Sequence, residues 1–238
     1  MGNLTRRHIL LAALAVLADA HGGPSLAQAA ELKVYVFAVT SIRPHVLQKM
    51  LETSLPGMSV SVFGRVGDFS RALEDAPPAA ALANSPVLAA FGQKPEIQGL
   101  KNNSPQEDYL VVSEDDVKAE ALADLTIGCL DLIGRKGLPA FVASLLGIQR
   151  EPAIQRVTKT EDLLQLLQFK RAGAILIPER FLSDLQARTK MDLKILRLPS
   201  AKMLRVGIAF PGNRQAVEGP IRALPAAVLE QLGVDHWR

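Results

Sequence analysis

The chain has 238 residues, of which 48% are hydrophobic and only 5% aromatic, and its formal net charge at pH 7 is +3. This hydrophobic fraction supports a globular core, and the small, scattered charge without a basic run excludes nucleic acid as an expected partner. The single cysteine, Cys129, excludes an internal disulfide. No cluster of His, Cys or carboxylate residues has the spacing of metal ligands, so we expect neither a metal nor another cofactor.

The first predicted element is an export leader. Arg6 and Arg7 precede an apolar run from Ile9 to Leu17, and an Ala-x-Ala cleavage pattern ends at Ala29. The run is too short to span a bilayer, which needs about 20 residues. The paired arginines resemble the twin-arginine export signal of bacteria, which carries folded proteins across the inner membrane. We therefore expect residues 1–29 to be removed and the mature protein to lie in the periplasm.

The mature chain begins with strands and helices in alternation. Apolar, β-branched runs indicate strands, and apolar residues at helical spacing between turn signals indicate helices. Alternation of this kind predicts an α/β fold with a largely parallel sheet. The predicted strands are 32–39, 58–63 and 79–83, and the predicted helices are 46–55, a short one around 69–73, and one that starts at Asn84-Ser85-Pro86.

The second part of the chain repeats this pattern after a polar connection at 101–108. A helix cap at 160–162, a proline at 178 and a turn at 211–213 separate its elements. Cys129 lies inside an apolar run, where a free cysteine is expected to be a small buried residue. The predicted strands are 109–112, 125–133, 154–157, 174–177, 195–198 and 204–210, and the predicted helices are 139–146, 160–169, one opened by Pro178, and 225–232.

Several segments together resemble a known family. They are LKVYVFAV (32–39), DYLVVSEDD (108–116), ALADLTIGCLDLIGRKGLPAFVASLLGI (121–148), VTKTEDLLQLLQFKRAGAILIPERF (157–181) and RVGIAF (205–210). Their order resembles the type II periplasmic solute-binding proteins of ABC transporters, nearest to the phosphate, phosphonate and sulfonate binding group.

The resemblance implies two lobes, each a mostly parallel sheet flanked by helices. The first lobe is expected to contain residues 30–108 and 208–238, and the second lobe residues 109–207. It also implies capture of a small anionic ligand in a cleft between the lobes, with an inner-membrane permease as a partner.

Loops at the carboxyl ends of parallel strands face such a cleft, and helices begin there with unpaired N–H groups that attract anions. For Asn84 and Ser85, helix capping without a ligand is an equally good interpretation. For Arg43, Arg135 and Lys136, a solvated surface charge is the alternative. The residues expected at the cleft are Thr40, Ser41, Arg43, Asn84, Ser85, Arg135, Lys136 and Arg180.

Two departures from the family pattern leave a second hypothesis open. Residues 134–139 lack the Ser and Thr side chains that phosphonate binders carry at this point, and Glu74-Asp75-Ala76-Pro77-Pro78 replaces the usual Gly-x-x-Asp. Under this second hypothesis, the chain is a receptor-fold accessory or sensory protein of a periplasmic or redox system that no longer serves transport. We expect no enzyme, because no catalytic motif is visible. An exported enzyme with its acid and base far apart in sequence is a third hypothesis.

Overall fold

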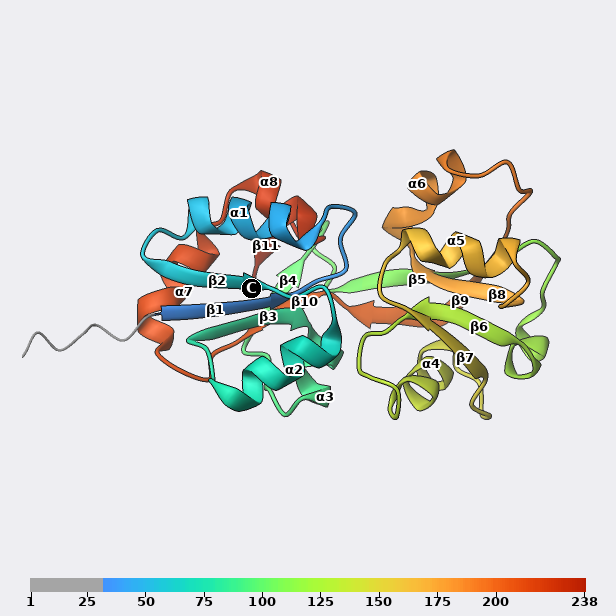
Figure 1. The fold of residues 1–238 in the computed structure, drawn as a ribbon, viewed down its shortest axis with the longest axis horizontal. Coiled ribbons are helices and arrows are strands. Elements are labelled where there is room, and N and C mark those ends of the chain that lie inside the picture. The colour runs from blue at the N-terminus through green and yellow to red at the C-terminus, as the bar shows by residue number, and fades with distance from the viewer. Residues whose placement is uncertain (1–31) are drawn as a thin grey trace, which may run out of the picture. The chain divides into compact units, whose positions relative to one another are not determined.

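A computed structural model describes residues 32–238, whose strands form two β-sheets (Figure 1). The predicted leader and its cleavage site lie outside the described residues. Within the described part of the chain, every helix is too short or too polar to cross a membrane. The α/β fold class with two lobes is confirmed, because each sheet contains parallel strands that alternate with helices.

The first sheet has the strand order β11-β4-β10-β3-β1-β2. β1 pairs in parallel with β2 and β3, whereas β10 pairs antiparallel with β3 and β4. The elements of this lobe are β1 (Leu32–Phe37), α1 (Pro44–Ser54), β2 (Met58–Val62), α2 (Val66–Asp75), β3 (Ala80–Asn84), α3 (Ser85–Ala90), β4 (Ile97–Leu100), β10 (Val206–Ala209), α7 (Arg214–Arg222), α8 (Ala226–Gln231) and β11 (His236–Trp237).

The second sheet has the strand order β7-β6-β8-β5-β9. β6 pairs in parallel with β7 and β8, and β5 pairs antiparallel with β8 and β9. The elements are β5 (Gln106–Ser113), the 3₁₀ helix η1 (Ala119–Asp124), β6 (Thr126–Leu130), α4 (Leu138–Leu146), β7 (Ala153–Val157), α5 (Glu161–Gln168), β8 (Ala174–Pro178), the 3₁₀ helix η2 (Glu179–Phe181), α6 (Leu182–Ala187) and β9 (Lys194–Leu204).

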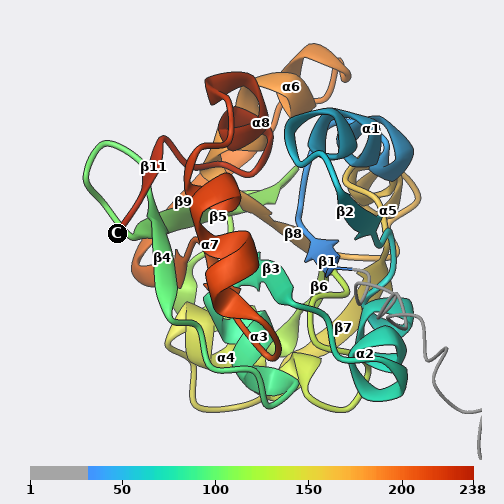
Figure 2. The same cartoon turned by 90° about the vertical axis from the view of Figure 1, so that its left-hand side faces the viewer.

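Alternation along β1 explains why the first sheet is covered on both faces. Val34 and Val36 belong to a buried cluster with residues of α1, α7 and α8, whereas Tyr35 and Phe37 belong to a second cluster with residues of α2 and α3. Successive side chains of a strand point to opposite faces, so one strand serves both layers. Figure 2 shows α1 and α8 on one side of the sheet and α2 and α3 on the other.

Two short crossings join the sheets. A turn at 101–105 leads from β4 to β5, with Asn102 and Asn103 at φ of 50° and 60°, the left-handed region that asparagine tolerates. The return crossing is Arg205, between β9 and β10. The Arg205 N–H donates to the carbonyl of Pro105 at 2.8 Å, so the two crossings lie side by side.

Several elements differ from the sequence prediction. These are among the differences: β4, η1, α7 and β11 were not expected, and β9 is one strand of 11 residues rather than a strand at 195–198 and the start of another. β9 tolerates Pro199 because it is an edge strand and its pairing with β5 shifts register at this point, which leaves residues 198–201 outside the paired positions. The pair Gly219-Pro220 in α7 hides its helical pattern.

Phe69 of α2 is the aromatic centre of the first lobe. It is fully buried, and its ring lies 5.7 Å from Phe37, 5.7 Å from Phe63 and 6.3 Å from Phe91, measured between ring centroids. We predict that Phe69→Ala lowers the free energy of unfolding by about 3–5 kcal/mol, because it removes a large buried side chain and leaves a cavity.

Phe169→Ala is the matched control, because the same atoms are removed from a side chain that is 69% exposed. Its expected effect is within about 0.5 kcal/mol. Urea unfolding of both variants measures the difference, and equal losses would contradict the assigned core.

Candidate functional site

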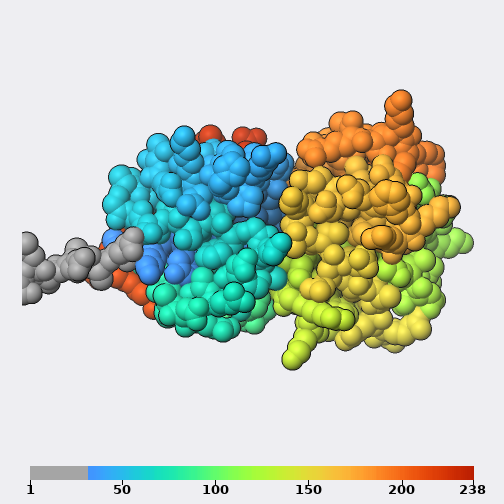
Figure 3. Space-filling view, viewed as in Figure 1, coloured from blue at the N-terminus to red at the C-terminus, as the bar shows by residue number. Residues whose placement is uncertain are grey.

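The carboxyl ends of the parallel strands of both sheets are directed toward the contact between the lobes. A hydrogen bond of 2.8 Å from Arg180 Nη2, just after β8, to the carbonyl of Val39, just after β1, joins the two ends directly. One buried apolar cluster also contains side chains of both lobes, among them Phe37 and Leu88 of the first and Leu130 and Leu132 of the second. On the face shown in Figure 3, the surfaces of the two lobes touch along their boundary.

Arg180 is the predicted site residue that donates from the second lobe to the first, and it also has partners within its own lobe. It forms an ion pair with Glu107 of β5 through Nη1, and its guanidinium lies 4.6 Å from the ring centroid of Phe181. Glu107 is also 3.5 Å from Arg205 Nη1, which donates to the carbonyl of Gly233 at 3.0 Å. The exposed fractions of the Arg180, Arg205 and Glu107 side chains are 20%, 12% and 4%. We call Arg180, Glu107 and Arg205 the hinge cluster.

Burial and the charge of Glu107 shift the pKa values of Arg205, within the hinge cluster, and of Tyr109, beside it. Burial lowers the pKa of Arg205 from its usual value, and the Glu107 carboxylate opposes this shift. Burial, followed by the charge of Glu107, raises the pKa of the Tyr109 phenol far above its usual value. Tyr109 therefore stays neutral beside the cluster.

The loop after β1 contains three more of the predicted residues, and Thr40 bonds within the first lobe. Thr40 Oγ1 donates to Gln231 Oε1 at 3.3 Å and accepts from the Ile42 N–H at 3.3 Å, while Ser41 and Arg43 are exposed. These three residues lie together in the loop between β1 and α1, beside the acceptor Val39.

Asn84 and Ser85 are buried, with 3% exposure each. α3 begins at Ser85 with proline in its first turn, as expected, but Asn84 makes no side-chain cap hydrogen bond. The predicted cap is wrong because the Asn84 amide donates instead to the carbonyl of Leu204 at 3.3 Å. Ser85 Oγ donates to Gln98 Oε1 at 2.6 Å. Both side chains therefore tie α3 to the crossing strands. Thr160, the predicted cap of α5, also makes no side-chain cap hydrogen bond.

Exposed cations gather where helices begin at the carboxyl ends of the strands. Arg135 and Lys136 precede the N-cap of α4, Arg43 is the N-cap of α1, and sequence reasoning missed two more of the kind. Arg65 is the N-cap of α2, and Lys159 precedes the N-cap of α5. The signal that could have found them is a basic residue directly before a predicted helix. We call Arg43, Arg65, Arg135, Lys136 and Lys159 the rim cations.

Within each lobe, the loops that carry the rim cations contact each other. A Cβ on Gly64, next to Arg65, would lie 3.2 Å from Pro44 Cγ, next to Arg43. In the second lobe the Asp131 N–H donates to the carbonyl of Val157 at 2.9 Å, which links the loops after β6 and β7.

No rim cation has an ion-pair partner among residues 32–238. The salt bridges of these loops involve other residues, since Asp131 pairs with Arg156 at 2.5 Å and Glu179 pairs with Arg197 at 2.5 Å. Carboxylates in the first turns of α2 and α5 offset part of the charge of the rim cations and leave an excess of positive charge. These carboxylates are Asp68, Glu161 and Asp162.

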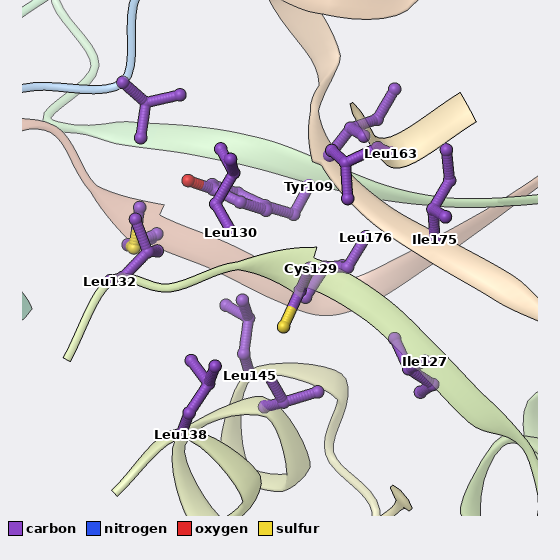
Figure 4. Close-up of a cluster of buried hydrophobic side chains, with 14 of the residues drawn as sticks. Tyr109, Ile127, Cys129, Leu130, Leu132, Leu138, Leu145, Leu163, Ile175 and Leu176 are labelled. Atoms are coloured by element: carbon purple, nitrogen blue, oxygen red, sulfur yellow. The ribbon is translucent and has the colours of Figure 1, made fainter. Parts of the chain in front are cut away.

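A small apolar cavity lies inside the second lobe between β6 and α4. Its volume is about 10 Å³, the room of a single water molecule, and Tyr109, Cys129 and Phe141 are among its lining residues. Figure 4 shows the Cys129 thiol directed toward Leu138 and Leu145 of α4. The cavity is too small for a solute. Among residues 32–238, no three His, Cys, Asp or Glu side chains lie together in a group that could hold a metal ion.

No protein-family model matches this sequence. No curated protein matches it either. Solved structures match it in fold. A Xanthomonas citri protein bound to ATP superposes with a TM-score of 0.62 at 12% identity, covering 87% of this chain and 90% of that chain.

Two further solved structures have the same fold. The arginine-, lysine-, histidine-binding protein ArtJ from Geobacillus stearothermophilus gives a TM-score of 0.56 at 13% identity, covering 86% of this chain and 96% of that chain. The periplasmic VFT2 domain of Bordetella pertussis BvgS gives 0.53 at 11% identity, covering 85% of this chain and 92% of that chain. The described chain therefore has the fold of type II periplasmic solute-binding proteins. The phosphate, phosphonate and sulfonate subgroup stays a prediction.

Cys129 is buried, as expected, with 3% exposure, and burial raises the pKa of its thiol to about 12, with the charge of Asp131 acting in the same direction. We predict that the native protein does not react with a thiol reagent at pH 8, because only the thiolate is nucleophilic. Reaction should appear at the urea concentration that unfolds the chain.

A Ser183→Cys variant is the control, since this position on α6 is exposed and its thiol should react at once. Rapid reaction of native Cys129 would show that the second lobe opens locally around α4.

Proposed function

We propose that this chain is a periplasmic solute-binding protein, exported by its twin-arginine-like leader, that captures a small anionic ligand between its lobes for an ABC transporter. The fold and its two lobes support binding of a solute. The observation that carries the anionic character of the ligand is the set of rim cations.

The position of the rim cations is electrostatically unusual. A helix N-terminus carries about half a positive charge from aligned peptide dipoles and normally attracts Asp or Glu, a preference of about 0.3–1 kcal/mol. Here Arg43 and Arg65 are N-caps, and Arg135, Lys136 and Lys159 lie within two residues of one. Cations and helix termini of the same sign repel each other, and a bound anion relieves this repulsion at several helices at once.

The rim cations also come from both lobes. Arg43 and Arg65 belong to the first lobe, and Arg135, Lys136 and Lys159 to the second. An anion held between them bridges the lobes and favours their contact over their separation. Guanidinium and ammonium groups then replace the hydroxyl groups that are missing at 134–139, because both form strong charge-assisted hydrogen bonds with phosphate, sulfonate or carboxylate oxygens.

A second candidate function is a receptor-fold accessory or sensory protein that no longer serves transport. Two observations favour it: Arg180 is already occupied by Glu107 and the Val39 carbonyl, and apolar side chains of both lobes share one cluster at the boundary. Genes for a permease and an ATPase beside this gene favour transport, whereas an oxidoreductase or a sensor kinase favours the accessory role.

We predict that the double variant Arg135→Ala/Lys136→Ala loses anion affinity at least tenfold, the equivalent of about 1.4 kcal/mol, because two charge-assisted contacts are removed. The wild type is first screened by thermal shift against phosphate, sulfate, methylphosphonate, taurine, succinate and ATP. Calorimetry on the best anion then compares the variants, and the affinity should fall with added salt.

The double variant Lys94→Ala/Lys190→Ala is the control with the same change in net charge. Both lysines are exposed, and they lie in the connections that lead into β4 and β9. The control should bind like the wild type. Equal losses of affinity in the two double variants would show that net charge alone explains the effect. A screen without any thermal shift would favour the second candidate function.

A further inference from the structure

We propose that Arg180 is a latch that holds the two lobes together without a ligand, with the Glu107 carboxylate as its internal counter-ion. This inference does not depend on the proposed ligand and applies to either candidate function.

The latch makes two contacts: an ion pair within the second lobe, which we call its anchor, and a hydrogen bond to the first lobe. Arg180 follows β8, and its ion-pair partner Glu107 belongs to β5, which pairs with β8 in the second sheet. The other side of the guanidinium reaches the first lobe, where Nη2 donates to the Val39 carbonyl at 2.8 Å. Separation of the lobes breaks this last bond and leaves the Val39 carbonyl to water, while the anchor can stay intact.

Burial makes the internal counter-ion effective. Glu107 is 4% exposed and lies between two guanidinium groups, those of Arg180 and Arg205. A buried carboxylate needs paired charges around it, since an unpaired charge in the interior is strongly unfavourable. The ion pair with Glu107 therefore fixes the direction of the Arg180 side chain. The conformational entropy of this side chain is already lost before it contacts the first lobe.

The first lobe provides a space shaped for this guanidinium. Gly233, between α8 and β11, has φ of +73°, and a Cβ at this position would lie 3.0 Å from Arg180 Nη1 and 3.1 Å from Cζ. The Gly233 carbonyl accepts from Arg205 at 3.0 Å, so the same residue contacts both arginines of the hinge cluster. Glycine is required here by the approach of Arg180 as well as by its backbone conformation.

Apolar packing beside the latch acts in the same direction. The cluster that joins Phe37 and Leu88 to Leu130 and Leu132 is buried, so separation of the lobes exposes apolar surface to water. Polar latch and apolar contact together favour the closed arrangement in the absence of a solute.

The experiment measures the distance between the lobes in solution. Exposed residues on α1 and α6 are replaced in the variant Lys49→Cys/Ser183→Cys, and spin labels are attached for pulsed electron resonance. Cys129 is buried and stays unlabelled, so it can be retained. The expected result is one narrow distance distribution that does not change when 10 mM phosphate is added. Introducing Arg180→Ala should shift this distribution to longer distances and broaden it.

Two glycine variants keep the test independent of the ion pair. Gly233→Ala should open the lobes as Arg180→Ala does, because the new methyl group would lie 3.0 Å from Arg180 Nη1 and push the guanidinium out of its position. Gly57→Ala is the matched control, since Gly57 has φ of +81° and a Cβ there would contact nothing within 4 Å. It carries the same backbone strain without touching the latch, and its distance distribution should match that of the parent.

The proposal is overturned if the parent shows a broad, long distribution without ligand, or if Arg180→Ala and Gly233→Ala both keep the narrow one. Circular dichroism and the unreactive thiol of Cys129 verify that each variant is folded. Failure of the proposed ligand would appear in the thermal-shift screen and leaves these distances unaffected.

Discussion

The two chain crossings between the sheets lie side by side, and they constrain how the lobes can move relative to each other. The turn at 101–105 and Arg205 are bonded to each other through the Arg205 N–H and the Pro105 carbonyl, and Gln106 of β5 pairs with Leu204 of β9 directly beside them. Because both connections pass at one place, the lobes can move relative to each other only about that line. The carboxyl ends of β1 and β8 then meet on the same side of it, as the contact from Arg180 to Val39 shows.

Charged side chains between the lobes and at the strand ends form two groups that differ in burial. The hinge cluster is largely withdrawn from water and internally paired, so its role is to hold geometry. The rim cations are exposed and without ion-pair partners within residues 32–238. Exposed charges interact weakly with each other at physiological salt, but they attract an incoming anion and raise the rate of encounter. The two groups suit different tasks, one conformational and one concerned with a ligand.

Two polar side chains have roles that differ from those their local sequence pattern indicates. Asn84 stands before a helix with proline in its first turn, the usual place of a cap, yet its amide bonds to the return strand. Glu107 lies in a stretch that reads as a polar surface connection, yet it is among the most buried charged groups of the described chain. In both cases a segment more than 70 residues away supplies the partner.

The sequence by itself determined the α/β class, most of the strands and helices, and the burial of Cys129. These features depend on local periodicity and on the burial preferences of residue types. Both can be recognised from residues that are close together in the sequence. Only the tertiary structure decided that Arg180 pairs with Glu107 and that Asn84 and Ser85 bond to the crossing strands. The physical reason is that hydrogen bonds and ion pairs act between atoms brought together by the order of strands in the sheets. That order depends on contacts between distant segments, which no local pattern records.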